Sequence, residues 1–235
     1  MNSTKKSARM TGFLYLLMIA TGVFSVMYVP GKLMVRGDAA ATAANILASQ
    51  SLFTIHIVNQ LFSVLFFLSV VLVLYFLLKE VDKRLAVLMV ILVLIQIPGG
   101  VWSVMNQITA LELLRGEDFW STVDRPLREA LAMSFLDLNG KGTNASELFW
   151  GLWLFPLGLL VFRSGFLPRF LGVWLIINCF AYVTISLTGL LAPQYSDIVN
   201  TIAFPTLLGE VALMLWLLMM GAKPKSLVDA ASAGG

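Results

Sequence analysis

Long apolar stretches separated by short polar ones are the dominant pattern along the chain. Six of these stretches are long enough to cross a bilayer, which takes about 20 residues per helix. Because every backbone amide in the hydrocarbon layer has to be paired within its own segment, we predict that each stretch is a helix. The regular alternation typical of a membrane β-barrel does not occur. The predicted helices lie near residues 10–29, 52–78, 85–111, 147–162, 171–191 and 201–220.

The composition supports this prediction. Of the 235 residues, 59% are hydrophobic and 12% are charged, whereas soluble domains carry about 25% charged residues. We therefore expect an all-α membrane protein, with about six transmembrane helices in one domain at 10–220 and the lipid bilayer as its surroundings. The net charge of +3 is small, and the basic residues form no continuous patch with interleaved aromatics. Binding to nucleic acid is therefore not expected.

The basic residues predict the orientation of the helices. The segment 1–9 precedes a first apolar run that could be a signal peptide, but the run is too long and no A-x-A site follows, so we expect a retained anchor. With this segment in the cytoplasm, the inner segments hold most Lys and Arg residues, as the positive-inside rule requires. We expect a cell-membrane protein with both termini cytoplasmic and a disordered tail at 221–235. The inner residues are Lys5, Lys6, Arg9, Lys79, Lys83, Arg84, Arg163, Arg169, Lys223 and Lys225.

Two outer loops are predicted to contain short interfacial helices. Asp38 can cap one through "AAATAANILASQ". The segment "DRPLREALAMSFLDLNGKG" has an apolar stripe, with Pro126 in the first turn and Gly140 and Gly142 at the predicted stop. Such a helix would lie on the membrane surface. A lid over a cavity is the alternative interpretation of the loop 112–146.

Polar residues share one face on two neighbouring predicted helices, since residues three and four apart lie on the same side. In "HIVNQLFS" these are His56, Asn59, Gln60 and Ser63. We predict that this side turns toward the third helix and away from lipid. Between the third helix's polar residues, Pro98 in "IPGG" predicts a kink or an opening. The small and polar residues of the third helix are Gln96, Gly99, Gly100, Ser103, Asn106 and Gln107.

Glu210 lies about nine residues into the last predicted helix, which places it near the middle of the membrane. An ionised, unpaired carboxylate at that depth would cost several kcal/mol, so Glu210 is protonated, paired or in contact with water. The candidate partners are His56, Asn106, Gln107 and Tyr182.

These residues give a set of candidate ligand-binding positions. A hydrated cavity is one interpretation, because ionisable residues inside a membrane are functional candidates by default. Hydrogen bonding that only holds helices together is the alternative. The candidates are His56, Asn59, Gln60, Gln96, Asn106, Gln107, Tyr182 and Glu210.

Catalytic and cofactor motifs are not found in the sequence. The single histidine, His56, excludes a metal site built on several histidines, and the single cysteine, Cys179, lies in an apolar run. No G-x-S-x-G elbow, H-E-x-x-H motif or glycine-rich phosphate loop occurs. We therefore name no catalytic residue, metal or cofactor.

Four stretches resemble a known family. They are "ARMTGFLYLLMIATGVFS", "GDAAATAANILASQSLF", "ELFWGLWLFPLGLLVFRSGFLPRFLGVWLIINCFAY" and "PTLLGEVALMLWLL". Together they resemble the prokaryotic membrane proteins known as domain of unknown function 4386. The resemblance implies a bacterial or archaeal multi-helix membrane protein and brings no activity, substrate or catalytic residue.

Three functions follow from these patterns. The first is a protein that binds a small or lipidic ligand, or passes it through an outward-facing polar cavity. The second is a structural or regulatory subunit whose polar faces only pack helices. The third and least favoured is an intramembrane enzyme acting on lipids, with His56 and Glu210 as acid and base.

Overall fold

The computed structural model describes residues 3–35 and 37–222, and every regular element in this part of the chain is a helix. The tail from residue 223, with Lys223 and Lys225, lies outside the described residues, as does Arg36. The elements are α1 (Ser3–Val23), the π-helix η1 (Phe24–Tyr28), α2 (Val29–Leu33), α3 (Ala39–Ala48), α4 (Gln50–Leu78), α5 (Lys83–Leu94), α6 (Ile97–Arg115), the 3₁₀-helix η2 (Asp118–Thr122), α7 (Arg125–Leu152), α8 (Leu154–Arg163), α9 (Arg169–Leu191), the 3₁₀-helix η3 (Pro193–Tyr195) and α10 (Ser196–Met219).

The predicted membrane architecture is confirmed. Within the described residues, six helical segments are long and apolar enough to cross a bilayer. Three of them contain two consecutive α-helices, so nine of the ten described α-helices make the six spans and the tenth, α3, lies outside them. The chain is therefore an all-α, multi-pass membrane protein. The six segments are Lys5–Leu33, Gln50–Leu78, Lys83–Arg115, Arg125–Arg163, Arg169–Leu191 and Pro193–Met219.

The chain divides into two compact units, which we describe separately. Unit 1 comprises Met1–Met18, Phe66–Gln96 and Asn144–Gly235. Unit 2 comprises Ile19–Leu65 and Ile97–Thr143. Helices α1, α4 and α7 contribute residues to both units.

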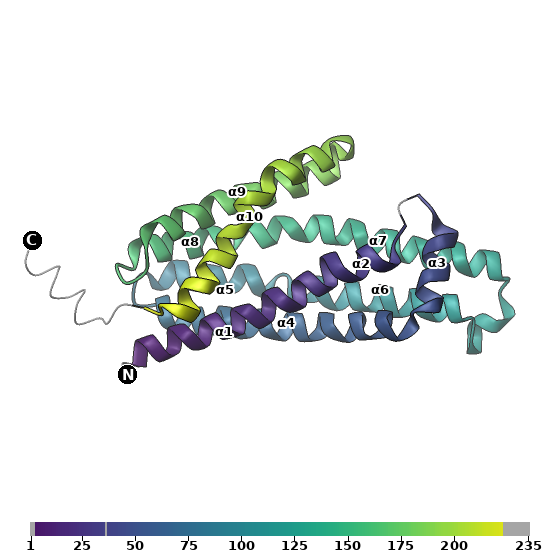
Figure 1. Cartoon of the computed structure of the whole chain (residues 1–235), viewed down its shortest axis with the longest axis horizontal. Helices are drawn as coiled ribbons and strands as arrows, with labels where there is room; N and C mark the ends of the chain where they lie inside the picture. Colours follow the sequence, from purple (N-terminus) through teal and green to yellow (C-terminus); the bar gives the residue numbers. More distant parts are fainter. Residues whose placement is uncertain (1–2, 36, 223–235) are drawn as a thin grey trace, which may run out of the picture. The chain divides into compact units, whose positions relative to one another are not determined.

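Glycines bring the helices of unit 1 close together. A Cβ at Gly158 of α8 would lie 2.8 Å from the carbonyl oxygen of Gly172 of α9, so only glycine allows this approach. A Cβ at Gly209 of α10 would lie 3.0 Å from the Trp174 ring of α9. Small residues at such crossings let membrane helices gain van der Waals contact where lipid provides no hydrophobic drive. Accordingly, α9 packs against both α8 and α10 (Figure 1).

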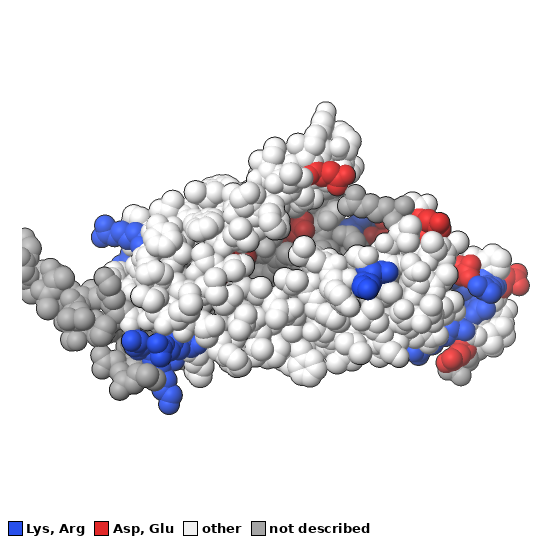
Figure 2. Space-filling view, viewed as in Figure 1, with Lys and Arg blue, Asp and Glu red and all other residues white. Residues whose placement is uncertain are grey.

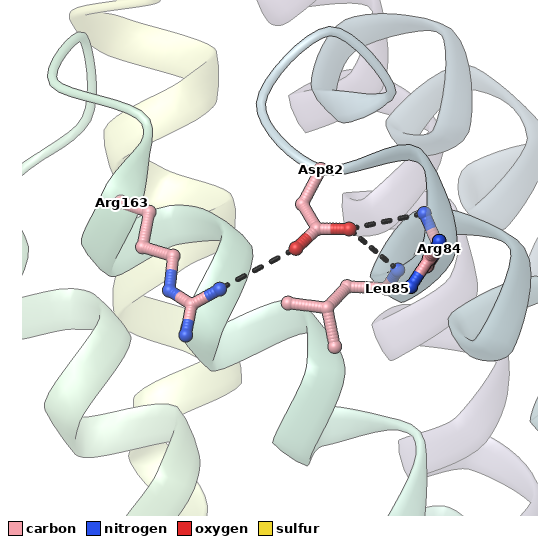
Figure 3. Close-up of polar contacts among 4 residues, drawn as sticks. All are labelled: Asp82, Arg84, Leu85 and Arg163. Carbon is pink, nitrogen blue, oxygen red and sulfur yellow. Dashed lines mark hydrogen bonds and ion pairs between the residues drawn. The ribbon is translucent and has the colours of Figure 1, made fainter.

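One end of unit 1 collects helix ends and basic side chains (Figure 2). Arg9 near the start of α1 donates to the carbonyl oxygen of Met219 at the end of α10, at 3.1 Å. Asp82 caps α5 by accepting from the amides of Arg84 and Leu85, and its other oxygen lies 3.4 Å from Nη1 of Arg163 (Figure 3). The cap satisfies amides that a helix start leaves unpaired. The exposed ion pair adds little stability.

The core of unit 2 is formed by α2, α3, α4, α6 and α7, with Ile46, Phe53 and Leu113 fully buried in it. The predicted cap of α3 is confirmed, because Oδ1 of Asp38 accepts from the Ala41 amide at 2.8 Å. The helix that follows matches the predicted segment and is a separate short apolar helix.

The predicted helix stop at Gly140 and Gly142 is wrong. Helix α7 runs without interruption from Arg125 to Leu152, and neither glycine has a positive φ. A Cβ at Gly142 would overlap the Trp102 ring of α6, so this glycine makes room for a neighbouring helix. A glycine inside a helix costs only about 1 kcal/mol relative to Ala, which packing can offset. The fourth span thus begins at Arg125, well before residue 147, and the segment that was predicted to be an interfacial helix is part of this span.

The predicted break near Pro98 is confirmed. Helix α5 ends at Leu94 and α6 begins at Ile97. Proline has no amide hydrogen and its ring clashes with the carbonyl one turn earlier, so it sits best in the first turn of a helix. At the break, the Gln96 side chain donates to the carbonyl oxygens of Leu92 at 2.8 Å and Phe149 at 3.2 Å.

Candidate ligand-binding clusters

The predicted site residues fall into two groups. Unit 1 holds Gln96, Tyr182 and Glu210, and unit 2 holds the other five, His56, Asn59, Gln60, Asn106 and Gln107. The pairing of Glu210 with His56, Asn106 or Gln107 stays a prediction. Each group has hydrogen-bond partners within its own unit.

Glu210 of α10 is held by a tyrosine from the first helix. The Tyr15 hydroxyl donates to Oε2 of Glu210 at 2.8 Å, and the Tyr15 side chain is fully buried. Tyr182 of α9 also interacts with the Glu210 carboxyl, as predicted. Three helices therefore meet around one carboxyl group. We call Tyr15, Glu147, Tyr182 and Glu210 the Glu210 cluster.

Depth explains why these residues meet. Glu210 is nine residues before the end of α10, which is about 14 Å at 1.5 Å per residue. Tyr15 is ten residues after Lys5, the start of its span, which is about 15 Å along α1. Since both helix ends lie at the same end of unit 1, the two side chains reach the same level of the membrane.

Aromatic rings fix the positions of the two tyrosines. The Trp153 ring lies 6.4 Å from Tyr15 and 5.1 Å from Phe67, centroid to centroid, and Trp153 is buried. The Trp150 ring packs edge-on against Tyr182 at 6.4 Å. Aromatic pairs at such distances add to the energy of burial. The hydroxyl groups thus approach the carboxyl from rigid side chains.

Glu147 of α7 is a second carboxyl in this cluster, and it interacts electrostatically with Tyr182. Sequence reasoning missed it, because the predicted helix stop placed residue 147 at the membrane edge. Because α7 is continuous, Glu147 lies 22 residues after the start of its span at Arg125. A sequence prediction that continued the helix through Gly140 and Gly142 would have placed Glu147 inside the membrane.

Asn178 lies one helical turn before Tyr182 on α9 and is fully buried. Neither Nδ2 nor Oδ1 of its side chain has a hydrogen-bond partner. Leaving a buried polar group unsatisfied costs about 1–3 kcal/mol. A polar atom placed next to Asn178 would remove this cost, so the residue can serve as a ligand contact.

A second polar cluster links three helices of unit 2. The Ser103 hydroxyl of α6 lies 3.1 Å from Oε1 of Gln60 on α4 and 2.6 Å from Oδ1 of Asn139 on α7. Nε2 of Gln107 donates to the same hydroxyl at 3.3 Å. The Gln60 amide in turn lies 3.0 Å from Nε2 of His56. We call these five residues the His56 network.

The hydrogen bonds assign the His56 tautomer. Oε1 of Gln60 faces the Ser103 hydroxyl, so its Nε2 amide group donates to Nε2 of His56, and the ring proton resides on Nδ1. Nδ1 of His56, Oε1 of Gln107 and Nδ2 of Asn106 have no hydrogen-bond partner. All three residues are at least 95% buried. The network therefore binds helices together, and the side chains of His56 and Gln107, which carry its unpaired donor and acceptor, interact with each other.

The predicted direction of "HIVNQLFS" is confirmed for Gln60 and wrong for Asn59. Asn59 donates to the Thr21 carbonyl and to the Ser25 hydroxyl of the first span, both at 2.8 Å. The backbone there is irregular, since the π-helix η1 begins at Phe24. Side chains inserted beside a helix backbone commonly accompany such irregular turns. The sequence contains no signal for a π-turn, so this contact could not be predicted.

Among the described residues, no three His, Cys, Asp or Glu side chains come together as a metal ion would need.

Comparison with known proteins gives the family. The family model described as domain of unknown function (DUF4386) matches residues 10–221. The chain belongs to this family. An uncharacterised protein of Archaeoglobus fulgidus is 33% identical over 82 residues, which is 35% of this chain and 48% of that protein. The matched part thus spans about half the length of this relative. No solved structure matches the chain.

Proposed function

We propose that this family member binds a small polar or lipidic ligand at the Glu210 cluster, or passes it through the membrane there. The observation that carries the proposal is a carboxyl group deep in α10 that is held by Tyr15 from α1 and flanked by Tyr182 from α9. Ionisable groups at such depth are rare and mark ligand or ion pathways in many membrane proteins.

Two further residues support a ligand at this position. Glu147 places a second carboxyl beside Tyr182, and Asn178 offers an unsatisfied donor and acceptor one turn away on the same helix. Carboxyl, hydroxyl and amide groups together match a small molecule that carries hydrogen-bond donors, such as an amine or a polyol. The aromatic rings of Trp150 and Trp153 suit its apolar part.

We further propose that the protein resides in the cell membrane with both termini in the cytoplasm. Six spans bring the two ends to the same side. The described basic residues of unit 1 lie at helix ends, at the same end of the unit as the start of α1. This is the pattern of a cytoplasmic surface.

A structural or regulatory subunit is the second candidate, and the His56 network favours it. Ser103 bonds directly to residues of two other helices, as expected for polar residues that hold a bundle together. The acid and base that an enzyme would need, His56 and Glu210, belong to different units and have partners within them. We propose no reaction for the chain.

Native mass spectrometry of the protein released from its own membrane tests the proposal. Wild-type protein should carry a bound mass beyond the polypeptide, and Glu210→Gln should reduce its occupancy by about tenfold, as the loss of one hydrogen bond to a charged group implies. Thr184→Val is the matched control, because its hydroxyl bonds only to the Phe180 carbonyl of its own helix.

The stability of the same variants separates the two candidates. If Glu210→Gln loses the bound mass and melts near the wild-type temperature, the carboxyl serves a ligand. If no mass is bound to the wild type and Glu210→Gln melts at a lower temperature, the cluster is structural and the proposal is wrong.

A further inference from the structure

A separate pocket at one end of unit 2 is lined by three arginines. Its volume is about 290 Å³, and its polar lining is Gln50, Arg115, Glu117, Arg125 and Arg128. We infer that this pocket binds a phosphate group, and that the phosphate is the headgroup of a membrane lipid. The inference does not depend on the function proposed for Glu210.

Charge is the first argument for phosphate. The lining contains three arginines and one carboxylate residue, Glu117, so it is positive overall. Guanidinium presents donors in a fork that matches phosphate oxygens. The single carboxylate suits the ammonium group of a zwitterionic headgroup. A pocket of this size accommodates a headgroup rather than a whole lipid.

The arginines are positioned by bonds that leave most of their donors for a ligand. Nε of Arg115 donates to Oε1 of Gln50 at 3.0 Å, and Nε of Arg125 donates to Glu129 at 2.8 Å. Each bond engages Nε alone, whereas a guanidinium group has four further N–H donors at its end. These bonds thus orient the side chains of Arg115 and Arg125 and leave their terminal N–H donors available to a ligand.

Arg128 packs against the loop that follows α6. Its Nη1 donates to the Leu113 carbonyl at 3.5 Å, and its buried Nε has no hydrogen-bond partner. The guanidinium lies against Gly116, where a Cβ would overlap it and where φ is +68°. Glycine adopts this conformation without strain. Gly116 therefore leaves room beside the loop after α6 for the Arg128 guanidinium, whose Nε donor is free to bind a ligand.

The surroundings of the pocket favour a lipid over a soluble phosphate ester. Phe119, two residues after Glu117, is 75% exposed and packs edge-on against Trp120. Leu127, between Arg125 and Arg128, is 54% exposed. Exposed aromatic and aliphatic side chains beside arginines are typical of the interface between headgroups and acyl chains.

The test is native mass spectrometry of the purified full chain with added lipids of defined headgroup. The probes are phosphatidylglycerol, phosphatidylethanolamine and diacylglycerol, which lacks phosphate, with inorganic phosphate as a soluble competitor. We expect both phospholipids to bind and diacylglycerol not to bind. Arg128→Gln should weaken phospholipid binding about tenfold, and the more exposed Arg125→Gln about threefold.

Two controls keep the result interpretable. Lys141→Gln removes a charge from the same helix outside the pocket, where Lys141 pairs with Asp137 on the exposed surface, and should change nothing. Arg125→Gln guards against misfolding of Arg128→Gln, because the Arg125 side chain is 74% exposed.

Two results would overturn the inference. Equal binding of diacylglycerol, or phospholipid binding unchanged in both arginine variants, rules out a phosphate site here. If inorganic phosphate displaces the lipids and binds by itself with the same dependence on Arg125 and Arg128, the phosphate chemistry is upheld and its lipid source is wrong.

Discussion

At the scale of single residues, the hydrogen bond from the Tyr15 hydroxyl to the Glu210 carboxyl is the central contact of the proposed site. A hydroxyl that donates to a carboxyl in a lipid environment has little competition from water, so its loss leaves a polar group unpaired. The bond also joins the first span to the last, 195 residues apart in sequence.

Tyr15→Phe should therefore destabilise the protein by about 1–2 kcal/mol, because it removes the donor and keeps the ring packed on Trp153. Unfolding in mixed micelles of increasing denaturant content measures this change. Tyr28→Phe is the control, since Tyr28 is half exposed and stacks on Phe24. Equal stability of the two variants would mean that the Tyr15–Glu210 bond contributes nothing.

Residue patterns predicted part of this site. The depth of Glu210 and the nearness of Tyr182 followed from helix geometry. Tyr15 was overlooked because a tyrosine in an apolar run resembles ordinary packing, although it lies ten residues from the start of its span and Glu210 lies nine residues from the end of α10. Asn178, polar but buried without a partner, is recognisable only from three-dimensional packing.

At the scale of elements, α7 shows how a glycine can be misread. Gly140 and Gly142 stand two residues apart in one helix, yet their surroundings differ. Nothing lies within 4 Å of a Cβ at Gly140, whereas a Cβ at Gly142 would overlap Trp102. The same residue type is thus incidental at one position and required at the other.

The two glycines give a matched prediction. Gly140→Ala should stabilise the protein by up to about 1 kcal/mol, because alanine favours the helix. Gly142→Ala should destabilise it by about 1–3 kcal/mol, because Trp102 has to move. The same micelle unfolding assay measures both. If Gly140→Ala were the destabilising variant, α7 would end there, as the sequence pattern alone suggested.

Elements with a local cause were predicted well, and elements with a distant cause were not. The cap by Asp38 and the break at Pro98 follow from the chemistry of one residue and its neighbours. The continuity of α7 and the π-turn near Ser25 depend on side chains from other helices, Trp102 and Asn59. A single sequence contains no record of those contacts.

At the scale of the whole molecule, the six-span architecture followed from apolar length alone. The division into two compact units did not. His56, Asn106 and Gln107, which sequence spacing suggested as partners of Glu210, belong to unit 2, whereas Glu210 belongs to unit 1, and their pairing stays a prediction. Helices long enough to contribute to both units make this division invisible in a linear pattern.

Membrane orientation is testable with single cysteines in a Cys179→Ser background. Thr122→Cys, in η2, should react with a membrane-impermeant maleimide in intact cells, whereas Lys6→Cys should react only after permeabilisation. The reason is the excess of basic residues at the helix ends of unit 1. Reaction of the residue 6 variant in intact cells would contradict the proposed orientation.

A high-resolution structure of the full chain in a lipid nanodisc, inspected for density around Glu210, is the most direct test of the proposed function. Ligand binding predicts a density between the Glu210 carboxyl and the side chains of Tyr182 and Asn178, which Glu210→Gln abolishes. A dry interface, with Tyr15 and Tyr182 bonded directly to Glu210 and no further density, would contradict it and leave the cluster a packing contact.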